Sequence, residues 1–154
     1  MNVAHFSDTS SDSVNGPSKY LTFVLGDESY GIEITHVTEI VGMQKITPIP
    51  DAPHYVRGVI NLRGKVIPVI DVRMRFGLSE REYNSRTCII VLAVRGQDVG
   101  MIVDRVQEVH DIGDGVMQAP PTFGDGGSPP YVKGVAKVED GVRILLDADR
   151  LLFQ

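Results

Sequence analysis

Residues 55–72 read "YVRGVINLRGKVIPVIDV", and residues 131–148 read "YVKGVAKVEDGVRILLDA". The two stretches superpose when the first is shifted by the 76 positions that separate Tyr55 from Tyr131, which aligns their Tyr-Val and Gly-Val pairs and a closing Asp. Each stretch consists of two runs of β-prone residues around a Gly-containing turn, which is the pattern of a β-hairpin. The repeat predicts one small β-rich fold that is duplicated along the chain.

A second repeated unit precedes each of these hairpins. The runs "YLTFVL" (20–25) and "YGIEI" (30–34), joined by "GDES", match "IIVLAV" (89–94) and "VGMIV" (99–103), joined by "RGQD". The shift here is 69 positions, and it also aligns the amphipathic segments "THVTEIV" and "DRVQEVH". The seven residues by which the two shifts differ fall in the loop 111–130, whose Gly, Pro and Asp content favours neither helix nor strand.

About five short strands per copy, with turn signals every 8–12 residues, predict a small closed barrel. Pro68 inside "VIPVI" predicts a bulge or an unpaired strand edge. Because a lobe of about 60 residues buries too little surface to be stable alone, we expect two barrels to pack together. We therefore expect a domain over residues 19–154, with a first lobe at about 20–80 and a second at about 87–154, after a polar, disordered tail at 1–18.

The chain is acidic, with a formal net charge of −5 over 154 residues, which argues against a protein that mainly coats nucleic acid. The charge is uneven, since residues 57–86 contain seven basic and three acidic side chains. This stretch is either a solvated face or a patch that meets an acidic protein surface. No apolar run approaches the roughly 18 residues that span a bilayer, and the Ser- and Asp-rich start is unlike a signal peptide. These features predict a cytoplasmic protein without direct membrane insertion.

The sequence contains no recognisable catalytic or metal-binding motif. None of the four histidines stands at zinc-ligand spacing from another His or from Cys88. Nucleophile-elbow, P-loop and dinucleotide-binding patterns are also missing from the sequence. Cys88 lies in the apolar run "CIIVLAV", where a buried structural thiol is expected. We therefore predict a protein that is not an enzyme and that uses no cofactor or metal.

The polar residues that stand out belong to the first copy: Glu39, Arg57, Asn61 and Arg63. In the second copy, Arg57 is replaced by Lys133 and Arg63 by Glu139, so that the charge at the hairpin turn is reversed. Two similar barrels with opposite charge at one turn present different surfaces to their partners. The duplication is thus expected to serve two different contacts.

Several of these motifs together point to a known family. "GVINLRG" (58–64), followed by "PVIDVR" (68–73), resembles the first lobe of CheW-type chemotaxis coupling proteins. "VGMIVDRVQEVHDI" (99–112) and "YVKGVAKVEDGVRILLDADRLL" (131–152) resemble the second lobe of the same family. The resemblance implies a mainly β fold of two intertwined, five-stranded SH3-like β-barrels, related by internal duplication, with short helices.

The resemblance implies an adaptor that couples transmembrane chemoreceptors to the histidine kinase CheA. The implied partners are the cytoplasmic tips of methyl-accepting chemoreceptors, the regulatory domain of CheA and, through self-association in array rings, other copies of the chain. The implied location is the cytoplasm, with recruitment to membrane-associated receptor arrays. In the family the receptor hairpin lies in an apolar groove between the lobes, and the matching positions here are Val37, Cys88, Val106 and Val109.

Glu39 and Arg63 match family positions that are implicated in receptor or kinase coupling, and Arg57 and Asn61 lie beside them in the sequence. We expect Glu39 and Arg63 to pair across the first barrel and to fix the turn that the kinase reads. An ordinary surface ion pair is the alternative. Gly58 and Gly64 are expected to meet backbone requirements rather than to contact a partner.

Other interpretations remain open at this point. A coupling protein of a pilus-motility or other non-flagellar chemosensory system fits the same residues. A detached regulatory domain of a CheA-like kinase keeps the fold but changes the role. A small-barrel nucleic-acid binder would use the basic stretch 57–86, and its affinity would fall steeply with salt. An unrecognised hydrolase would need a nucleophile that the motifs do not identify.

Overall fold

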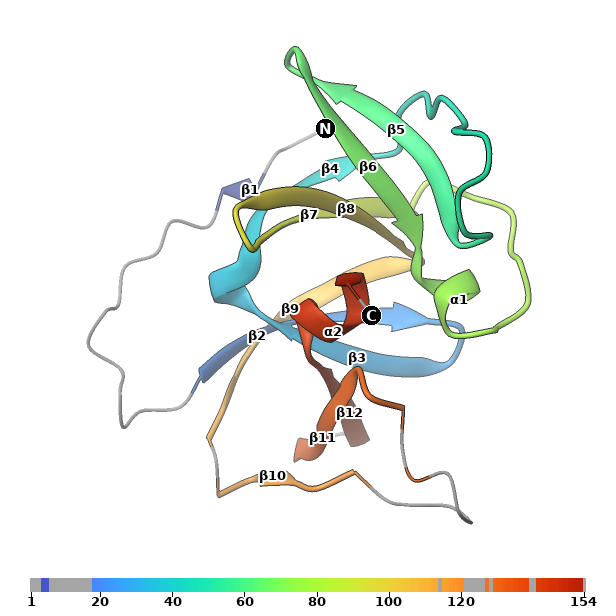
Figure 1. The fold of residues 1–154 in the computed structure, drawn as a ribbon. Helices are drawn as coiled ribbons and strands as arrows, with labels where there is room; N and C mark the ends of the chain where they lie inside the picture. Colours follow the sequence, from blue (N-terminus) through green and yellow to red (C-terminus); the bar gives the residue numbers. More distant parts are fainter. Residues whose placement is uncertain are drawn as a thin grey trace. The chain divides into compact units, whose positions relative to one another are not determined.

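The computed structural model describes residues 4–5, 18–113, 115–120, 127, 129–138 and 141–153. The chain divides into two compact units (Figure 1). The first unit comprises Met1–Phe6 and Val37–Val106, and the second comprises Ser7–His36 and Gln107–Gln154. The chain therefore passes from the second unit to the first after His36 and returns after Val106.

The first unit is built on one sheet with the strand order β1-β4-β7-β8-β6-β5. Its elements are β1 (Ala4–His5), β4 (Val37–Gly42), β5 (Val56–Leu62), β6 (Lys65–Asp71), α1 (Val72–Arg75), β7 (Cys88–Val94) and β8 (Gln97–Val103). Five of the strands have six or seven residues each, while β1 has two. The prediction of a five-stranded unit is met by the five longer strands.

The second unit is built on a sheet with the strand order β10-β11-β12-β3-β2-β9. Its elements are β2 (Ser18–Leu25), β3 (Glu28–Glu33), the 3-10 helix η1 (Ile34–His36), β9 (Arg105–Ile112), β10 (Met117–Gln118), β11 (Val132–Val138), β12 (Gly141–Leu146) and α2 (Ala148–Phe153). Here too, five strands have six to eight residues and one, β10, has two. The predicted mainly β fold of two related SH3-like barrels with short helices is confirmed.

Each unit combines hairpins from both copies of the repeat. In the first unit, β6 of the first copy pairs in parallel with β8 of the second copy, with Val69 opposite Gly100. In the second unit, β12 of the second copy pairs in parallel with β3 of the first copy, with Ile144 opposite Tyr30. The predicted division into consecutive lobes at about 20–80 and 87–154 differs from this arrangement, because the first hairpin of each copy joins the other copy's sheet. The predicted intertwining describes the structure correctly.

The segment after β4 closes the first sheet. Thr47 and Val59 exchange two backbone hydrogen bonds of 2.9 Å each, so that this segment pairs with the outer edge of β5. In the second unit β10, which follows β9, pairs with β11 in the same way. Both closures leave no room for a side chain at the repeated glycines: a Cβ on Gly58 would lie 2.1 Å from the Thr47 carbonyl oxygen, and one on Gly134 would lie 2.7 Å from that of Gln118.

The strand pairing contains matching irregularities in the two units. The β5–β6 register shifts between Val56 and Gly58, and the β11–β12 register shifts between Val132 and Gly134. Pro68, by contrast, is a regular position of β6 opposite Val59, so the expected bulge or unpaired edge is wrong. Proline has no backbone N–H to donate. Val59, its partner on β5, uses both its own N–H and its C=O to bond with Thr47, so it needs no hydrogen bond from Pro68.

The hairpin turns are tighter than predicted. Leu25 pairs with Glu28, and Val94 pairs with Gln97, so that two residues rather than four form each turn. The β5–β6 turn also has two residues, Arg63 with φ of 53° and Gly64 with φ of 85°. Positive φ at both positions matches the type I′ turn that suits the right-handed twist of paired strands. Gly64 adopts this conformation easily, whereas Arg63 is an unusual residue there.

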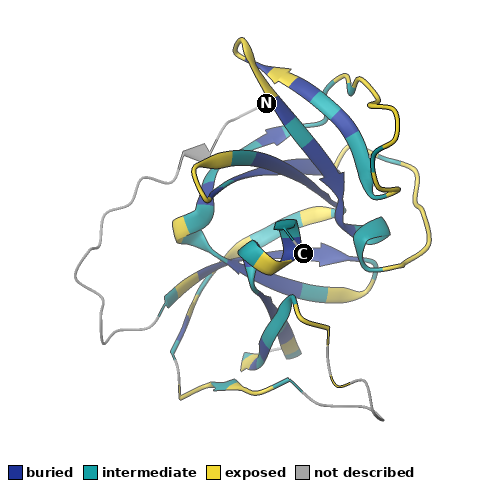
Figure 2. Ribbon diagram, viewed as in Figure 1, coloured by how far each residue is buried: buried dark blue, intermediate teal, exposed yellow. Residues whose placement is uncertain are grey.

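Each unit has its own apolar core (Figure 2). The core of the first unit contains Val41, Ile60, Leu62, Ile67, Val69, Ile89, Val91 and Ile102. A smaller cluster in the second unit contains Tyr20, Ile112, Ala136 and Leu145. Cys88 at the start of β7 is buried, as predicted for a structural thiol.

The N-terminal region is only partly described. Within the predicted tail at 1–18, Ala4–His5 form β1, which pairs with Ile40 and Glu39 of β4, and Ser18 begins β2. The structure therefore differs from the predicted tail at these three residues, and the β4 edge provides the backbone partners of β1. The rest of the tail lies outside the described residues, as does most of the second half of the loop 111–130. Among the helices of the described residues, none has the length and apolarity of a membrane span.

Candidate functional site

The predicted pair between Glu39 and Arg63 forms in the first unit. Glu39 lies on β4 opposite Val91, and Arg63 is the first residue of the β5–β6 turn. The Arg63 Nη2 atom donates a hydrogen bond to the Glu39 Oε2 atom. The contact joins positions 24 residues apart in the sequence and ties the tip of the hairpin to β4. The predicted pairing is confirmed.

Burial is unequal within this ion pair. The Glu39 side chain is 9% exposed, whereas the Arg63 side chain is 62% exposed. The Glu39 Oε1 atom has no hydrogen-bond partner among the described residues. A buried carboxylate is costly without a counter-charge, so Arg63 compensates a charge that the fold has already removed from water. The pair therefore differs from an ordinary exposed ion pair, whose contribution is about 0–1 kcal/mol.

Asn61 shapes the same turn. Its Oδ1 atom accepts a hydrogen bond of 2.8 Å from the Gly64 backbone N–H, while its side chain lies on the exposed face of β5. Its partner across the hairpin, Val66, is 66% exposed. Glu39, Asn61 and Arg63 therefore come together at one end of the β5–β6 hairpin, beside an exposed apolar side chain.

Arg57 lies away from this group. It occupies the irregular position at the start of β5, about 20 Å along the strand from Arg63 at roughly 3.3 Å per residue. Its guanidinium contacts Met74 and Glu80, and it stacks over the Tyr83 ring at 5.8 Å. The prediction grouped Arg57 with Arg63 because they are close in the sequence. In the structure Arg57 is separated from the other three residues of the predicted cluster.

Lys133 is the counterpart of Arg57 in the second unit. Its Nζ lies 3.4 Å from Glu33 Oε2 and 5.0 Å from the centre of the Tyr20 ring. Burial alone would lower the pKa of Lys133, but the hydrogen bond with Tyr20 and the charge of Glu33 raise the pKa above its ordinary value. Both copies thus place a cation at the strand irregularity, against a tyrosine and a glutamate.

The four residues predicted to line a receptor groove differ in exposure. Val37 and Cys88 are buried at the starts of β4 and β7, Val106 is half-buried, and Val109 on β9 is exposed. Burial, opposed only weakly by a hydrogen bond involving the Val106 backbone, raises the pKa of the Cys88 thiol to about 11. Val109 is therefore the residue of this set that is best able to contact a partner, and the groove itself stays a prediction.

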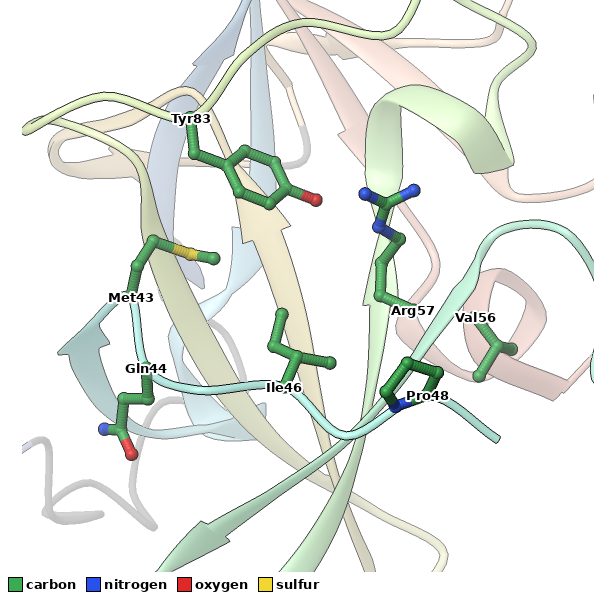
Figure 3. Close-up of a pocket in the computed structure, with 7 residues that line it drawn as sticks. All are labelled: Met43, Gln44, Ile46, Pro48, Val56, Arg57 and Tyr83. Carbon is green, nitrogen blue, oxygen red and sulfur yellow. The ribbon is translucent and has the colours of Figure 1, made fainter. Parts of the chain in front are cut away.

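Sequence reasoning missed a pocket in the first unit. It has a volume of about 450 Å³ and is lined by Met43, Gln44, Ile46, Pro48, Val56, Arg57 and Tyr83 (Figure 3). The signal that could have indicated it is the apolar, proline-containing segment "GMQKITPIP" (42–50) between two strands. Tyr83 gave no such signal, since its position depends on a long-range contact with Asp71.

The described residues contain no group of three or more His, Cys, Asp or Glu side chains arranged to hold a metal ion. The Glu39–Arg63 pair also differs from a catalytic acid–base pair, because the arginine guanidinium stays charged and cannot exchange a proton with the carboxylate. This end of the hairpin is held in place by contacts within the first unit.

Comparisons with known proteins agree with this arrangement. Residues 19–154 match the family model described as "CheW-like domain". The chain is 35% identical to the chemotaxis protein CheW of Klebsiella aerogenes over 87% of this chain and 81% of the relative. It is 38% identical to the chemotaxis protein CheW of Treponema pallidum over 85% of this chain and 79% of that relative. The crystal structure of the scaffolding protein TtCheW from Thermoanaerobacter tengcongensis superposes with a TM-score of 0.81 and 38% identity, covering 90% of this chain and 94% of that one. The family match spans nearly all of the chain, and this chain belongs to the CheW-like family.

Proposed function

We propose that this chain is a chemotaxis adaptor that couples the cytoplasmic tips of chemoreceptors to the regulatory domain of the histidine kinase CheA. The observation that carries the proposal is the match of residues 19–154, which includes both units, to one family of coupling proteins. The role is one of binding without turnover, performed in the cytoplasm at receptor arrays. Self-association of the chain in array rings belongs to the same proposal.

The first unit supplies the surface that we assign to coupling. Arg63 is exposed but anchored to the buried Glu39, and Asn61 fixes the turn through Gly64. A partner therefore meets a cation that Glu39 already holds in place, on the same hairpin as the exposed apolar side chain of Val66. Preorganisation of this kind increases affinity because less conformational entropy is lost on binding.

The second unit has the same scaffold with a different charge. In the aligned sequences, Arg63 and Gly64 of the first copy correspond to Glu139 and Asp140 of the second. Charges at the rim of an interface mainly determine which partner associates and how fast. This difference supports two separate contacts, one through each unit, as an adaptor requires. Val109, exposed on β9, is our candidate for the apolar contact with the receptor.

Co-sedimentation tests the adaptor role. Receptor-containing membranes are mixed with the cognate CheA, with and without the chain, and pelleted. We expect the kinase to enter the pellet efficiently only when the chain is present. The proposal is contradicted if the chain pellets with neither partner, or if it leaves the amount of pelleted kinase unchanged.

A matched pair of variants tests the assigned surface. Arg63→Ala is compared with Arg95→Ala, since both residues begin two-residue hairpin turns with similar φ angles, 53° and 56°. We expect Arg63→Ala to reduce the pelleted kinase and Arg95→Ala to leave it unchanged. Equal effects would overturn the assignment of the Glu39–Arg63 surface while leaving the adaptor role standing. The flagellar or pilus-related output is decided separately, by which form of motility fails when the chain is deleted.

A further inference from the structure

Two adjoining pockets lie on the first unit, at the opposite end of β5 from the Glu39–Arg63 pair. The first is the pocket of about 450 Å³ described above, and the second has a volume of about 410 Å³ and is lined by residues 80–83 together with Arg57. Arg57 and Tyr83 line both. We call the two pockets together the Arg57 groove.

One wall of the Arg57 groove is apolar. Met43 and Ile46 are partly buried against the core of the first unit, and their remaining surfaces face the pocket together with Pro48 and Val56. Figure 3 shows the Met43 and Ile46 side chains extending toward the Tyr83 ring, which belongs to a different chain segment. Apolar walls with a few placed polar groups are typical of sites that bind a ligand or a peptide side chain.

Both walls are held in place by contacts inside the unit. The Tyr83 hydroxyl donates a 2.8 Å hydrogen bond to Oδ2 of Asp71, which is buried. On the other side, the exchange of two hydrogen bonds between Thr47 and Val59 fixes the segment that carries Ile46 and its neighbours. The groove is therefore preformed, so that little ordering is needed when a partner enters.

The polar group of the groove is the Arg57 guanidinium. Its Nη1 atom donates to Met74 Sδ at 3.4 Å, an ordinary distance for sulfur, and to Glu80 Oε2 at 3.3 Å, which is long for a charged donor and a carboxylate. The Glu80 side chain is 63% exposed, against 31% for Arg57. An exposed carboxylate at this distance binds weakly and exchanges readily, so Glu80 marks where a partner's carboxylate would bind.

We propose that the Arg57 groove is a docking site for a short segment of a partner protein that presents an aliphatic side chain followed by a carboxylate. The aliphatic side chain enters the pocket between Met43, Ile46 and Tyr83. The carboxylate replaces that of Glu80 on Arg57, where a planar guanidinium favours bidentate contact. This site is separate from the Glu39–Arg63 surface, so its test does not depend on the proposed adaptor role.

An NMR titration of the full chain tests the site. The probe is the synthetic peptide acetyl-Gly-Ser-Leu-Leu-Glu-Ser-Gly-amide, added to the 15N-labelled protein. Two control peptides replace Glu by Gln, or both Leu by Ser. We expect shift changes that saturate and that centre on the amides of Met43, Ile46, Arg57 and Tyr83. Each control peptide should bind at least about threefold more weakly, since each removes one of the two contacts.

Four variants separate the proposal from general charge effects. We expect Arg57→Ala to weaken binding of the probe roughly three- to tenfold, and Arg86→Ala, which removes an exposed cation from the same region outside both pockets, to leave it unchanged. Glu80→Gln removes the competing carboxylate and should tighten binding about two- to threefold. Glu82→Gln removes the same charge from the same segment and should have a smaller effect.

The gain of affinity in Glu80→Gln keeps the proposal testable even if Arg57→Ala disturbs the fold. The proposal is overturned if the probe produces no saturable shifts, if the shifts centre outside the groove, or if the Gln-containing peptide binds as tightly as the probe. Equal effects of Glu80→Gln and Glu82→Gln would overturn the assignment of Glu80 as the group that the partner's carboxylate replaces.

Discussion

Replacing Gly58 by Ala should disrupt the closure of the first barrel. An added Cβ would lie 2.1 Å from the Thr47 carbonyl oxygen and 2.9 Å from the Pro48 Cα atom. Both are backbone atoms, so no side-chain rotation relieves the contact. The segment around Thr47 must move away by about 1 Å or more, because carbon and oxygen in ordinary contact are more than 3 Å apart.

The magnitude follows from what this movement breaks. The two Thr47–Val59 hydrogen bonds are both 2.9 Å long, and each contributes about 0.5–1.5 kcal/mol net. The φ of Gly58 is 142°, where an alanine adds about 1–2 kcal/mol of backbone strain. We therefore expect Gly58→Ala to lower the free energy of unfolding by about 2–5 kcal/mol.

Gly64→Ala is the matched control on the same hairpin. Gly64 has a φ of 85°, but nothing lies within 4 Å of a Cβ built there. Only backbone strain remains, and we expect a loss of about 1 kcal/mol. Urea denaturation followed by far-ultraviolet circular dichroism measures both variants against the wild type. The steric reasoning is refuted if Gly64→Ala costs as much as Gly58→Ala at unchanged denaturant sensitivity.

Four further predictions concern buried polar groups. Tyr83→Phe should lower the free energy of unfolding in urea by about 1–3 kcal/mol, because the Oδ2 atom of the buried Asp71 carboxylate loses the hydroxyl that donates to it. A wild-type value would show that this hydrogen bond is dispensable. Burial and then the hydrogen bond to Asp71 raise the pKa of Tyr83 to about 12. The stability that the protonated hydroxyl contributes should therefore be complete below the unfolded pKa near 10 and be lost as the pH rises through about 12. The free energy of unfolding measured against pH would detect this loss. The Cys88 thiol, with its pKa raised by burial to about 11, should react with a disulfide reagent at pH 8 only as fast as the protein opens, and rapid labelling of the native chain would contradict its burial. Arg63→Ala should lower the free energy of unfolding by about 1–2 kcal/mol more than Glu39→Gln does, because only Arg63→Ala leaves the buried Glu39 carboxylate without its counter-charge. The reverse order in urea denaturation would refute this reasoning.

The repeat in the sequence predicted much of the fold because a hairpin is a local structure. β-prone runs around a Gly-containing turn specify their own pairing, as in β5 and β6. The division between the units was not predictable in this way. The first hairpins of the two copies have similar sequences, so the local pattern alone does not decide which second hairpin each of them joins. The parallel pairings of β6 with β8 and of β12 with β3 depend on the whole chain.

The candidate site was predictable to a similar degree. The Glu39–Arg63 pair was expected from family positions, and the structure forms it. The separation of Arg57 from Arg63 follows from the length of an extended strand, which their closeness in the sequence conceals. The role of Tyr83 was not predicted, because only the folded chain brings its hydroxyl to Asp71. This contact also places the Tyr83 ring as one wall of the Arg57 groove.

Autophosphorylation of the cognate CheA with receptor-containing membranes tests the central claim most directly. The reaction is run without the chain, with the wild type, with Arg63→Ala and with Arg95→Ala, after the variants are shown to be folded. The account predicts strong stimulation by the wild type and by Arg95→Ala, and little by Arg63→Ala. If the wild type fails to change kinase activity in the presence of receptors, the chain does not act as a coupling adaptor, and the account is wrong.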